Sequence, residues 1–290
     1  KMLKGMFDQY VPPAHIDQMM ADPEAYTFDG DSKELTVLFA DIRSFTTISE
    51  SLTAKELKRL LNNFFTPITK EIFDQQGTID KYVGDMVMAF WGAPIDDDNH
   101  RNNAILAAIN MQIITADLKA EFKEQGLPEV NIGVGLNTGF MNVGDMGSSY
   151  RRSYTVLGDA VNLGSRLESI TKFYGSKILI GEDTYDHCDG FVCRFVDRIQ
   201  VKGKDTAIRV YEPLGLEGGV PQEILDELDE YNQAYQLHLD RKWDEALTAF
   251  TALSEKNPLG VYGVYLERIP HLKEQELPED WDGTFRHTSK

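Results

Sequence analysis

Hydrophobic positions along the chain follow two different spacings. Residues 35–40 form a short apolar run without glycine or proline, which predicts a strand buried on both faces. From residue 53 to residue 76 the apolar positions lie three and four apart, the period of an amphipathic helix. The expected apolar face of this helix consists of Leu57, Leu60, Leu61, Phe64, Phe65, Ile68 and Ile72. Asp41 directly follows the first run, so a carboxylate is expected where a buried strand ends.

A hairpin and a second helix are predicted next. Residues 78–83 and 86–91 are apolar arms around Gly84-Asp85, a turn signal that predicts an exposed Asp85 at the turn or at the start of the returning strand. Residues 101–125 repeat the helical period, with an expected apolar face of Ile105, Ala108, Ile109, Met111, Ile113 and Leu118. The acidic residues 96–98 are predicted to cap this helix with Asn99, since acidic residues favour helix starts. A metal site there is the alternative, but side chains adjacent in sequence do not converge.

Glycine and serine mark the expected breaks in the second half of the domain. Strands at residues 130–138 and 140–143 are separated by Gly139 and followed by a loop at 144–149. A strand ending near residue 157 leads into a helix on which Asn162 and Arg166, four positions apart, share one face. Further strands are expected at 177–180, 191–202 and 206–211, with Pro213 and residues 215–219 closing the domain.

The composition changes to helix-forming residues after Pro221. The pattern around Tyr231, Ala234, Trp243 and Phe250 is similar to one tetratricopeptide-type helical hairpin, with a generic helical cap as the alternative. A single hairpin of this type cannot bury its apolar face alone. It is therefore expected to pack on the main domain, on a second subunit or on a partner.

Composition and charge exclude several classes of protein. With 290 residues and 42% hydrophobic content, the chain has room for one substantial domain and a smaller appendage. No run approaches the roughly 18 apolar residues of a membrane span, and the start lacks a signal-peptide pattern. The net charge of −18 argues against nucleic acid as a partner, because such binding relies on clustered cations. Cys188 and Cys193 match no metal-binding spacing and are expected to be reduced thiols.

A small set of polar residues carries the candidate chemistry. Asp41 and Asp85 stand at strand or turn ends, and Lys81, Asn162 and Arg166 are cationic or amide groups on neighbouring elements. Hard divalent cations such as Mg²⁺ prefer carboxylate oxygens and complete their shell with substrate phosphates. Each aspartate alone is also explained by a strand-end cap or a salt bridge. Together with an arginine, the two aspartates indicate phosphoryl chemistry.

Three stretches, residues 38–46, 81–90 and 154–167, resemble in sequence and order the signature blocks of class III nucleotide cyclases. The resemblance extends from about residue 34 to residue 213. It implies an α/β fold (an α+β sandwich), a ferredoxin-like βαββαβ domain that works as a homodimer. The implied reaction converts a nucleoside triphosphate to its 3′,5′-cyclic monophosphate and pyrophosphate. The expected organisation is then an N-terminal connector helix segment at 1–33, a catalytic domain at 34–213, and a helical tail at 214–290.

The resemblance also assigns roles to residues. Asp41 and Asp85, assisted by the Ile42 carbonyl, are implied to hold two divalent metal ions, Mg²⁺ or Mn²⁺. Backbone amides of Arg43, Ser44, Phe45 and Thr46 are implied to cradle the triphosphate. Asn162 and Arg166 would orient the ribose and stabilise charge on the α-phosphate. Lys202 is the expected phosphate-binding lysine, with Lys204 as the alternative.

Substrate choice is implied to rest on Lys81 and Thr155. Lysine donates to adenine N1 and a threonine hydroxyl accepts from the exocyclic amine, so the pair favours ATP. Threonine at this position is similar to a bacterial subgroup of adenylyl cyclases that act in signal transduction. The sequence departs from the usual pattern at two positions: Ser44 and Gly164 stand where many members have glycine and alanine. The glycine is expected to cost up to about 1 kcal/mol of local helix stability.

The alternative from another class is a nucleotide-binding regulatory or scaffold domain that has lost turnover. A damaged copy is expected to lack at least one of Asp41, Asp85, Asn162 and Arg166, and all four are present. The chain begins with Lys1 rather than Met, as expected for a piece of a longer protein. The resemblance implies that the connector at residues 6–25 follows an upstream sensor, often membrane-anchored, with the catalytic region in the cytoplasm.

Overall fold

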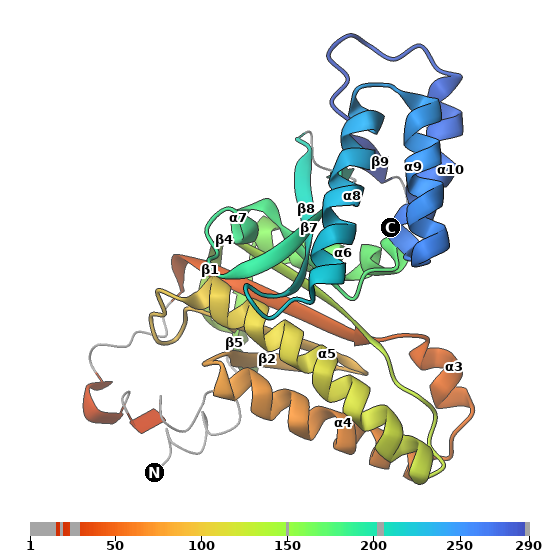
Figure 1. Ribbon diagram of the computed structural model, residues 1–290. Helices are drawn as coiled ribbons and strands as arrows, with labels where there is room; N and C mark the ends of the chain where they lie inside the picture. Colours follow the sequence, from red (N-terminus) through yellow and green to blue (C-terminus); the bar gives the residue numbers. More distant parts are fainter. Residues whose placement is uncertain (1–15, 18–19, 24–29, 149–150, 202–205, 288–290) are drawn as a thin grey trace.

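The computed structural model describes residues 16–17, 20–23, 30–148, 151–201 and 206–287, and it is built around one nine-stranded sheet (Figure 1). The strands lie in the order β2-β3-β1-β4-β6-β8-β7-β9, with β5 paired to β4. The first four strands therefore have the ferredoxin-like order, and the predicted fold class is confirmed. The connector helix predicted at 6–25 falls largely outside the described residues.

The strands of the sheet are β1 (Asp31–Ile42), β2 (Thr78–Val83), β3 (Met86–Trp91), β4 (Ile132–Ser148), β5 (Arg151–Leu157), β6 (Ile178–Gly181), β7 (Phe191–Val201), β8 (Ile208–Leu216) and β9 (Phe285–His287). The helices between them are α3 (Phe45–Glu50), α4 (Ala54–Asp74), α5 (His100–Glu124), α6 (Asp159–Tyr174) and α7 (Glu182–Tyr185). Three helices of the tail follow: α8 (Gln222–Leu239), α9 (Trp243–Lys256) and α10 (Gly260–Lys273).

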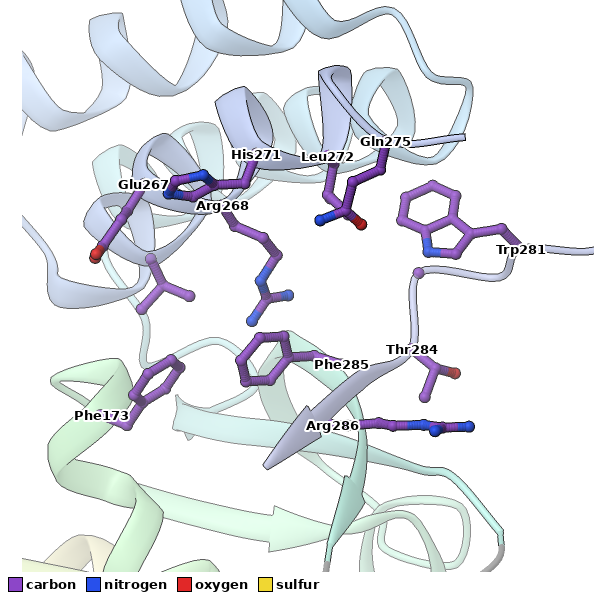
Figure 2. A pocket seen from close by; sticks show the side chains of 12 residues that line it. Phe173, Glu267, Arg268, His271, Leu272, Gln275, Trp281, Thr284, Phe285 and Arg286 are labelled. Atoms are coloured by element: carbon purple, nitrogen blue, oxygen red, sulfur yellow. The ribbon is translucent and has the colours of Figure 1, made fainter. Parts of the chain in front are cut away.

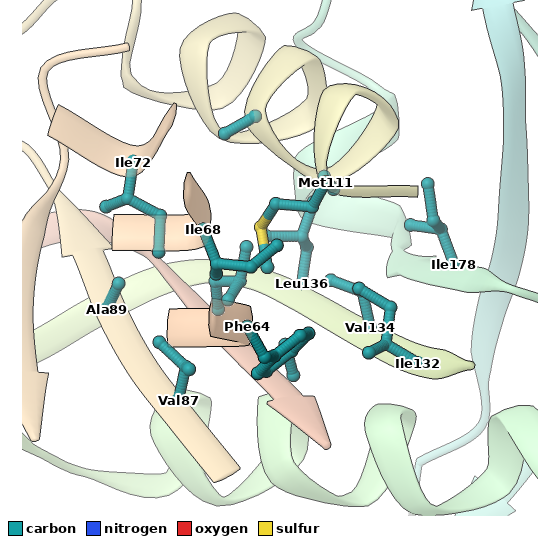
Figure 3. Close-up of a cluster of buried hydrophobic side chains, with 14 of the residues drawn as sticks. Phe64, Ile68, Ile72, Val87, Ala89, Met111, Ile132, Val134, Leu136 and Ile178 are labelled. Atoms are coloured by element: carbon teal, nitrogen blue, oxygen red, sulfur yellow. The ribbon is translucent and has the colours of Figure 1, made fainter. Parts of the chain in front are cut away.

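Strand β1 is buried on both faces, as its apolar run predicts. Leu38, Ala40 and Ile42 join the core beneath α4 and α5, while the alternate side chains of Leu35 and Val37 join a second cluster on the other face. Figure 3 shows the first core, in which α4 and α5 pack on the central strands. Because β1 lies between β3 and β4, it is also hydrogen-bonded along both edges.

The two predicted amphipathic helices form α4 and α5. A capping box starts α4: the Thr53 side chain accepts from the Glu56 amide, and the Glu56 carboxylate accepts from the Thr53 amide. The face predicted for α5 is wrong at Ile113, whose side chain is 56% exposed. Ile113 lies two positions after buried Met111, about 200° around the helix, so it points away from the core.

The acidic loop before α5 does not cap the helix as predicted. The N-cap residue is Asn99, and its side chain makes no capping hydrogen bond. Asp97 instead accepts from the Asn99 amide at 2.9 Å and from the Asn103 side chain at 2.9 Å. Asp97 is thus held within the loop, and Asp96 pairs with Lys33 of β1. The described residues contain no group of three or more His, Cys, Asp or Glu side chains that could hold a metal ion.

Strand β4 is longer than the sequence predicts. The two strands expected around Gly139 are one continuous strand, in which Gly139 pairs with Leu35, and the expected loop at 144–148 is its extended end. The reason is pairing on both sides, since β1 binds the first part of β4 and β5 binds residues 142–148. Strand β8 likewise continues through Pro213 to Leu216, beyond the predicted closing point of the domain.

The tail packs on the main domain of its own chain. Tyr231 of α8, Phe250 of α9 and Tyr265 of α10 share one buried cluster with Leu167 of α6 and Val210 of β8. The last described strand, β9, pairs in parallel with β7 and so extends the central sheet. The sequence left open whether the tail packs on the main domain, on a second subunit or on a partner, and in the structure it packs on the main domain. The likeness to a tetratricopeptide repeat stays a prediction.

A buried polar network ties the tail to the end of α6. The Arg268 guanidinium of α10 donates to both carboxylate oxygens of Asp197 on β7, at 3.1 and 2.7 Å. The Tyr174 hydroxyl of α6 donates to Asp197 at 2.6 Å and lies 2.9 Å from Nε2 of His287. A hydroxyl has one proton, so His287 is the donor in the second bond. Asp197 is fully buried, and this set of donors satisfies its carboxylate.

Both cysteines are free thiols, as the sequence predicts. Cys188 follows α7 and Cys193 lies on β7, and each is partly buried. The Cys188 thiol donates to the Tyr185 carbonyl at 3.3 Å. They contribute to the packing around β7 and β8.

Candidate active site

Two carboxylates from different elements meet at the end of β1. Asp41 is the second-to-last residue of β1, and Asp85 follows Gly84 at the tip of the β2–β3 hairpin. The Ile42 amide lies 3.1 Å from Asp41 Oδ1 and 3.2 Å from Asp85 Oδ2, so it donates to both. Burial, together with the neighbouring Asp41, raises the pKa of Asp85 to about 7. Two carboxylates in this arrangement favour the binding of a cation.

The loop after Ile42 differs from the predicted triphosphate cradle at one residue. The Arg43 amide donates to the Asn131 carbonyl at 2.7 Å, so it is not free for a phosphate. The Arg43 side chain donates to Thr171 Oγ1 at 2.6 Å and to the Ser176 carbonyl at 3.1 Å, which anchors the loop to the end of α6. Burial lowers the pKa of Arg43, against the influence of nearby acids. Arg43 is therefore an anchor, and the cradle is left to the next three amides.

Those three amides belong to the start of α3. Ser44 is its N-cap residue and has a left-handed conformation with φ 55°, and Phe45 and Thr46 form the first helical positions. Amides in the first turn of a helix have no partner within the helix. Ser44, Phe45 and Thr46 can therefore offer N–H groups to a ligand at this end of β1.

Lys81 and Thr155 come together through a residue that the sequence pattern did not single out. Asp80 accepts from the Thr155 hydroxyl at 2.6 Å and forms an ion pair with Lys81 Nζ at 3.2 Å. The Lys81 side chain is 46% exposed, whereas Thr155 and Asp80 are buried. An acidic residue in the middle of a short apolar strand arm was the available signal.

Asn162 and Arg166 lie on the first half of α6, as predicted. Asn162 is exposed and Arg166 is partly exposed. Helix α6 lies very close to the sheet, because a Cβ atom at Gly135 of β4 would be 2.2 Å from the Glu168 amide. Within the described chain, Arg166 has no hydrogen bond or ion pair with another residue. Its guanidinium is thus available to an anionic ligand.

One further carboxylate, Glu168, was missed by the sequence analysis. It is only 8% exposed, on the sheet-facing side of α6. Burial and the charge of Asp41 raise the pKa of Glu168 to about 7, while Arg43 acts in the opposite direction. Glu168 follows Leu167 in a helical pattern, and nothing in that pattern marks it as buried. Lys202 and its alternative Lys204 lie outside the described residues.

A pocket of about 440 Å³ lies elsewhere, between α10, β9 and the end of α6 (Figure 2). Arg268 extends from α10 toward Phe285, and its guanidinium carbon is 4.1 Å from the centre of that ring. Trp281 and Phe173 line other sides of the same pocket. None of its lining residues belongs to the predicted active site.

Comparison with known proteins decides the family. Residues 29–212 match the family described as the adenylate and guanylate cyclase catalytic domain, and this match covers more than half of the chain. The chain belongs to this family. The class III resemblance predicted from the three sequence blocks is confirmed.

Relatives match this cyclase domain over different lengths. An adenylate cyclase of Anabaena cylindrica is 39% identical over 189 residues, which cover 62% of this chain and 37% of the relative. A terminal-differentiation specific adenylate cyclase of Dictyostelium discoideum is 33% identical over 281 residues, covering 94% of this chain and 13% of that protein. The second match includes the tail. The chain therefore spans well under half the length of either relative.

The solved structure of the adenylyl cyclase CyaB from P. aeruginosa has the same fold. It is 36% identical with a TM-score of 0.61, and the match covers 67% of this chain and 100% of that chain. Membership of the family implies dependence on a divalent metal, and the oxygen donors of Asp41 and Asp85 fit that requirement. In the part of the chain described, no helix has the length and hydropathy needed to span a bilayer.

The two departures of this cyclase domain from the family pattern now have local explanations. A Cβ atom at Gly164 would be 2.8 Å from Val37 Cγ1, so the glycine lets α6 pack directly on β1. Ser44 has a positive φ of 55°, a conformation that suits glycine better than serine. The expected cost of Gly164 to the helix is thus offset by packing, whereas Ser44 strains the loop.

Proposed function

We propose that this cyclase domain is an adenylyl cyclase that converts ATP to 3′,5′-cyclic AMP and pyrophosphate. The observation that carries the proposal is the convergence of Asp41 and Asp85, 44 positions apart in the sequence, around the Ile42 amide. Two carboxylates held together are what a phosphate-bound divalent cation requires. The structural alternative of two separate strand-end caps does not bring the two side chains together.

Two divalent ions, Mg²⁺ or Mn²⁺, would be held by Asp41, Asp85 and the Ile42 carbonyl. When bound, they would supply positive charge beside the ribose 3′-hydroxyl and beside the leaving pyrophosphate. The carboxylates then hold their ions only in the deprotonated form. Since the pKa of Asp85 is raised to about 7, binding of the cations releases a proton from this pair near neutral pH.

The remaining residues orient the substrate for an in-line displacement. The ribose 3′-oxygen forms a bond to the α-phosphorus, the bond to the bridging oxygen of the β-phosphate breaks, and the hydroxyl proton is lost to solvent. Asn162 orients the ribose and Arg166 neutralises charge that develops on the α-phosphate. The amides of Ser44, Phe45 and Thr46 and a lysine, Lys202 or Lys204, hold the other phosphates. Arg43, which anchors the loop, has no catalytic role in this proposal.

Choice of ATP rests on Lys81 and Thr155, which the structure holds on either side of Asp80. Lys81 donates to N1 of adenine and Thr155 accepts from the 6-amino group. GTP presents a donor at N1 and an acceptor at position 6, so both contacts would be repulsive.

The active unit is proposed to be a homodimer with shared sites. Elements that carry substrate residues also carry exposed apolar side chains: Tyr82 and Val83 follow Lys81, and Leu157 follows Thr155 by two positions. Leu157 is 53% exposed and Phe140 on the adjacent β4 is 71% exposed. Apolar surface of this size on a cation-poor protein favours contact with a second copy. Each site would then take Asp41 and Asp85 from one chain and Lys81, Thr155, Asn162 and Arg166 from the other.

The direct test is a turnover assay with ATP and with GTP, in Mn²⁺ or Mg²⁺, over a range of protein concentrations. Cyclic AMP and pyrophosphate are expected in equal amounts, with specific activity rising as dimers form. Absence of product at high protein concentration would contradict the enzyme proposal and support a binding domain that has lost turnover.

Mixed dimers test the shared site. Asp41→Ala and Arg166→Ala chains are each expected to be inactive, and mixing them restores one intact site per dimer. If both variants fold and exchange subunits without recovery of activity, the shared site is wrong. Control by an upstream sensor and a cytoplasmic location of this region are part of the same proposal.

A further inference from the structure

Asp80 occupies an irregular position in the β2–β3 hairpin. Ile79 pairs with Ala89 and Lys81 pairs with Met88, so Asp80 is an extra residue that faces no partner in the ladder. Such a bulge redirects side chains, and it brings two consecutive residues toward the same side of the strand. The Asp80 side chain is completely buried, while the next side chain, Lys81, reaches solvent. A buried carboxylate therefore lies directly behind an exposed ammonium.

Every polar contact of Asp80 comes from the groups assigned to base recognition or their neighbour. Asp80 Oδ2 accepts from the Thr155 hydroxyl at 2.6 Å and from the Val156 amide at 3.3 Å. Asp80 Oδ1 lies 3.2 Å from Lys81 Nζ and has no other partner among the described residues. The carboxylate thus connects the two base-contacting side chains, which come from strands 74 positions apart.

We infer that Asp80 is a specificity-determining residue, which fixes Thr155 as a hydrogen-bond acceptor and Lys81 as a donor toward the purine. This inference rests on the proposed function, because it explains how that site distinguishes one base from another. Asp80 touches neither the phosphates nor the reacting atoms, so it acts through its two neighbours.

The chemical reason lies in the hydroxyl of Thr155. A threonine hydroxyl normally donates or accepts, and a free one would accept from the amine of adenine or donate to the keto oxygen of guanine. An ionised carboxylate only accepts. Since Thr155 gives its proton to Asp80, only its lone pairs remain for the base, and these match a 6-amino group. A 6-keto oxygen is itself an acceptor, so its lone pairs would face those of the Thr155 hydroxyl and the contact would be repulsive.

The same carboxylate fixes the position of Lys81, whose Nζ lies 3.2 Å from Asp80 Oδ1. A lysine ammonium offers only donors, which match the unprotonated N1 of adenine. The 6-keto purines carry a proton on N1, so they meet a donor there as well. Asp80 therefore makes both contacts unfavourable for 6-keto bases. Loss of the carboxylate is expected to act mainly at Thr155, whose hydroxyl could then donate to a keto oxygen.

The test compares ATP with inosine triphosphate, which differs from ATP only at the position-6 group and N1. Asp80→Asn has the same shape, but its amide group can donate to Thr155, which lets the hydroxyl turn and donate to a keto oxygen. The ratio of kcat/KM for ATP over inosine triphosphate is expected to fall at least about tenfold in this variant. A general loss of packing would lower both values and leave the ratio unchanged.

Asp282→Asn is the matched control. Asp282 also accepts from a threonine hydroxyl, that of Thr284 at 2.5 Å, and pairs with a cation, Arg198, at 2.9 Å, but it lies in the tail. Its variant is expected to keep the wild-type ratio. Asp80→Asn should change the ratio less in a Thr155→Val background than in wild type, because the part of its effect that acts through the Thr155 hydroxyl is already lost.

Each outcome is decisive. An Asp80→Asn chain that folds, as judged by circular dichroism, and keeps the wild-type ratio overturns the inference and leaves adenylyl cyclase activity established. If Asp80→Asn does not fold, Thr155→Ser and Thr155→Val replace it: serine keeps the ratio and valine lowers it about tenfold, whereas an unchanged ratio in the valine variant overturns the inference. Wild-type protein that converts neither nucleotide overturns the proposed function and the inference together.

Discussion

The two ends of helix α6 have opposite polar surroundings. Its first half carries Asn162 and Arg166, which are exposed to different degrees, and Arg166 contacts no other polar group among the described residues. Its last residue, Tyr174, is fully buried and bonded to both Asp197 and His287. One end is open toward a ligand, whereas the other is closed by the tail. The close packing of α6 on Gly135 keeps the two ends in a fixed relation.

In the proposed mechanism, this difference separates catalysis, at the first half of α6, from stability, at its last residue. An open polar side chain contributes little to folding, because water satisfies it in both states. Removing one member of a closed network lowers the free energy of unfolding, since the remaining buried groups lose their partners. Substitutions at the two ends of α6 are therefore expected to affect different measurements.

The largest effect is expected at the open end. Arg166→Ala should lower kcat by about 10³-fold, because a preorganised cation is lost where charge develops on the α-phosphate. Thermal unfolding should shift little, since Arg166 has no partner to lose within the described chain. Arg166→Lys is the control and should recover only part of the activity, because lysine lacks the planar fork of donors. A large drop in thermal stability would show that this end is closed as well.

At the closed end, Asp197→Asn should reduce the free energy of unfolding by about 3 kcal/mol. The neutral amide leaves the buried Arg268 guanidinium without its counter-charge. Chemical denaturation measures the loss, and Asp282→Asn, whose ion pair with Arg198 is partly exposed, should lose no more than about 1 kcal/mol. Equal losses in the two variants would mean that burial does not increase the contribution of the Asp197 network to the free energy of unfolding.

Glu168, between the two ends, gives a dependence on pH. The folded-state pKa of about 7 exceeds the ordinary 4.5, so the folded protein holds this proton more tightly than the unfolded chain. Its contribution to stability therefore falls as pH rises from about 4.5 to about 7. In buffer without divalent metal, Glu168→Gln should be more stable than wild type by about 2 kcal/mol at pH 8 and equal to it at pH 4.5.

Chemical denaturation of wild type and Glu168→Gln across this pH range measures the difference in their free energies of unfolding. Glu255→Gln, at an exposed position, is the control and should show no such divergence from wild type. A constant difference between Glu168→Gln and wild type at all pH values would indicate a packing effect rather than titration.

Gly164→Ala restores the residue usual in the family and is nevertheless expected to destabilise the protein by about 1–2 kcal/mol. The added methyl group would contact Val37 at 2.8 Å and push α6 away from β1. Thermal and chemical unfolding test this, with the exposed helical Gly263, where nothing lies within 4 Å of a Cβ atom, as the control. Gly263→Ala should stabilise its helix by up to about 1 kcal/mol.

The smallest effect is expected for Ser44→Gly. Because Ser44 has a positive φ, glycine should relieve strain and stabilise the folded state by about 0.5–1 kcal/mol. The measurement is again chemical denaturation, accompanied by the KM for ATP. A loss of stability would mean that the serine hydroxyl contributes more than the backbone strain removes.

Much of the fold was predictable because local patterns agreed with tertiary burial. The run at 35–40 is buried as predicted, and the predicted face of α4 is buried at four of its seven positions and partly buried at the other three. The turn at Gly84 places Asp85 next to Asp41. Prediction failed where pairing between distant segments decided the outcome. Gly139 ends a strand by local rules, yet β1 and β5 hold β4 extended through it.

The roles of the candidate site residues stay predictions, and the contacts that support these residues could not be predicted from the sequence. Asp41, Lys81, Thr155 and Arg166 stand within sequence blocks that a family shares. The use of the Arg43 amide by Asn131, and the buried position of Asp80 between Lys81 and Thr155, depend on how separate strands meet. Such contacts have no local periodicity, so the sequence alone does not reveal them.

Strand β9 also bears on how this protein keeps its sheet from associating with others. It covers β7 by pairing Phe285 with Ile199 and His287 with Val201, and β7 would otherwise be the outer strand. A fragment cut at residue 213 would leave those backbone groups unpaired and uncover Tyr174. Exposed strand edges beside apolar surface recruit further strands. The tail is thus expected to determine whether the catalytic domain remains dispersed in solution or aggregates.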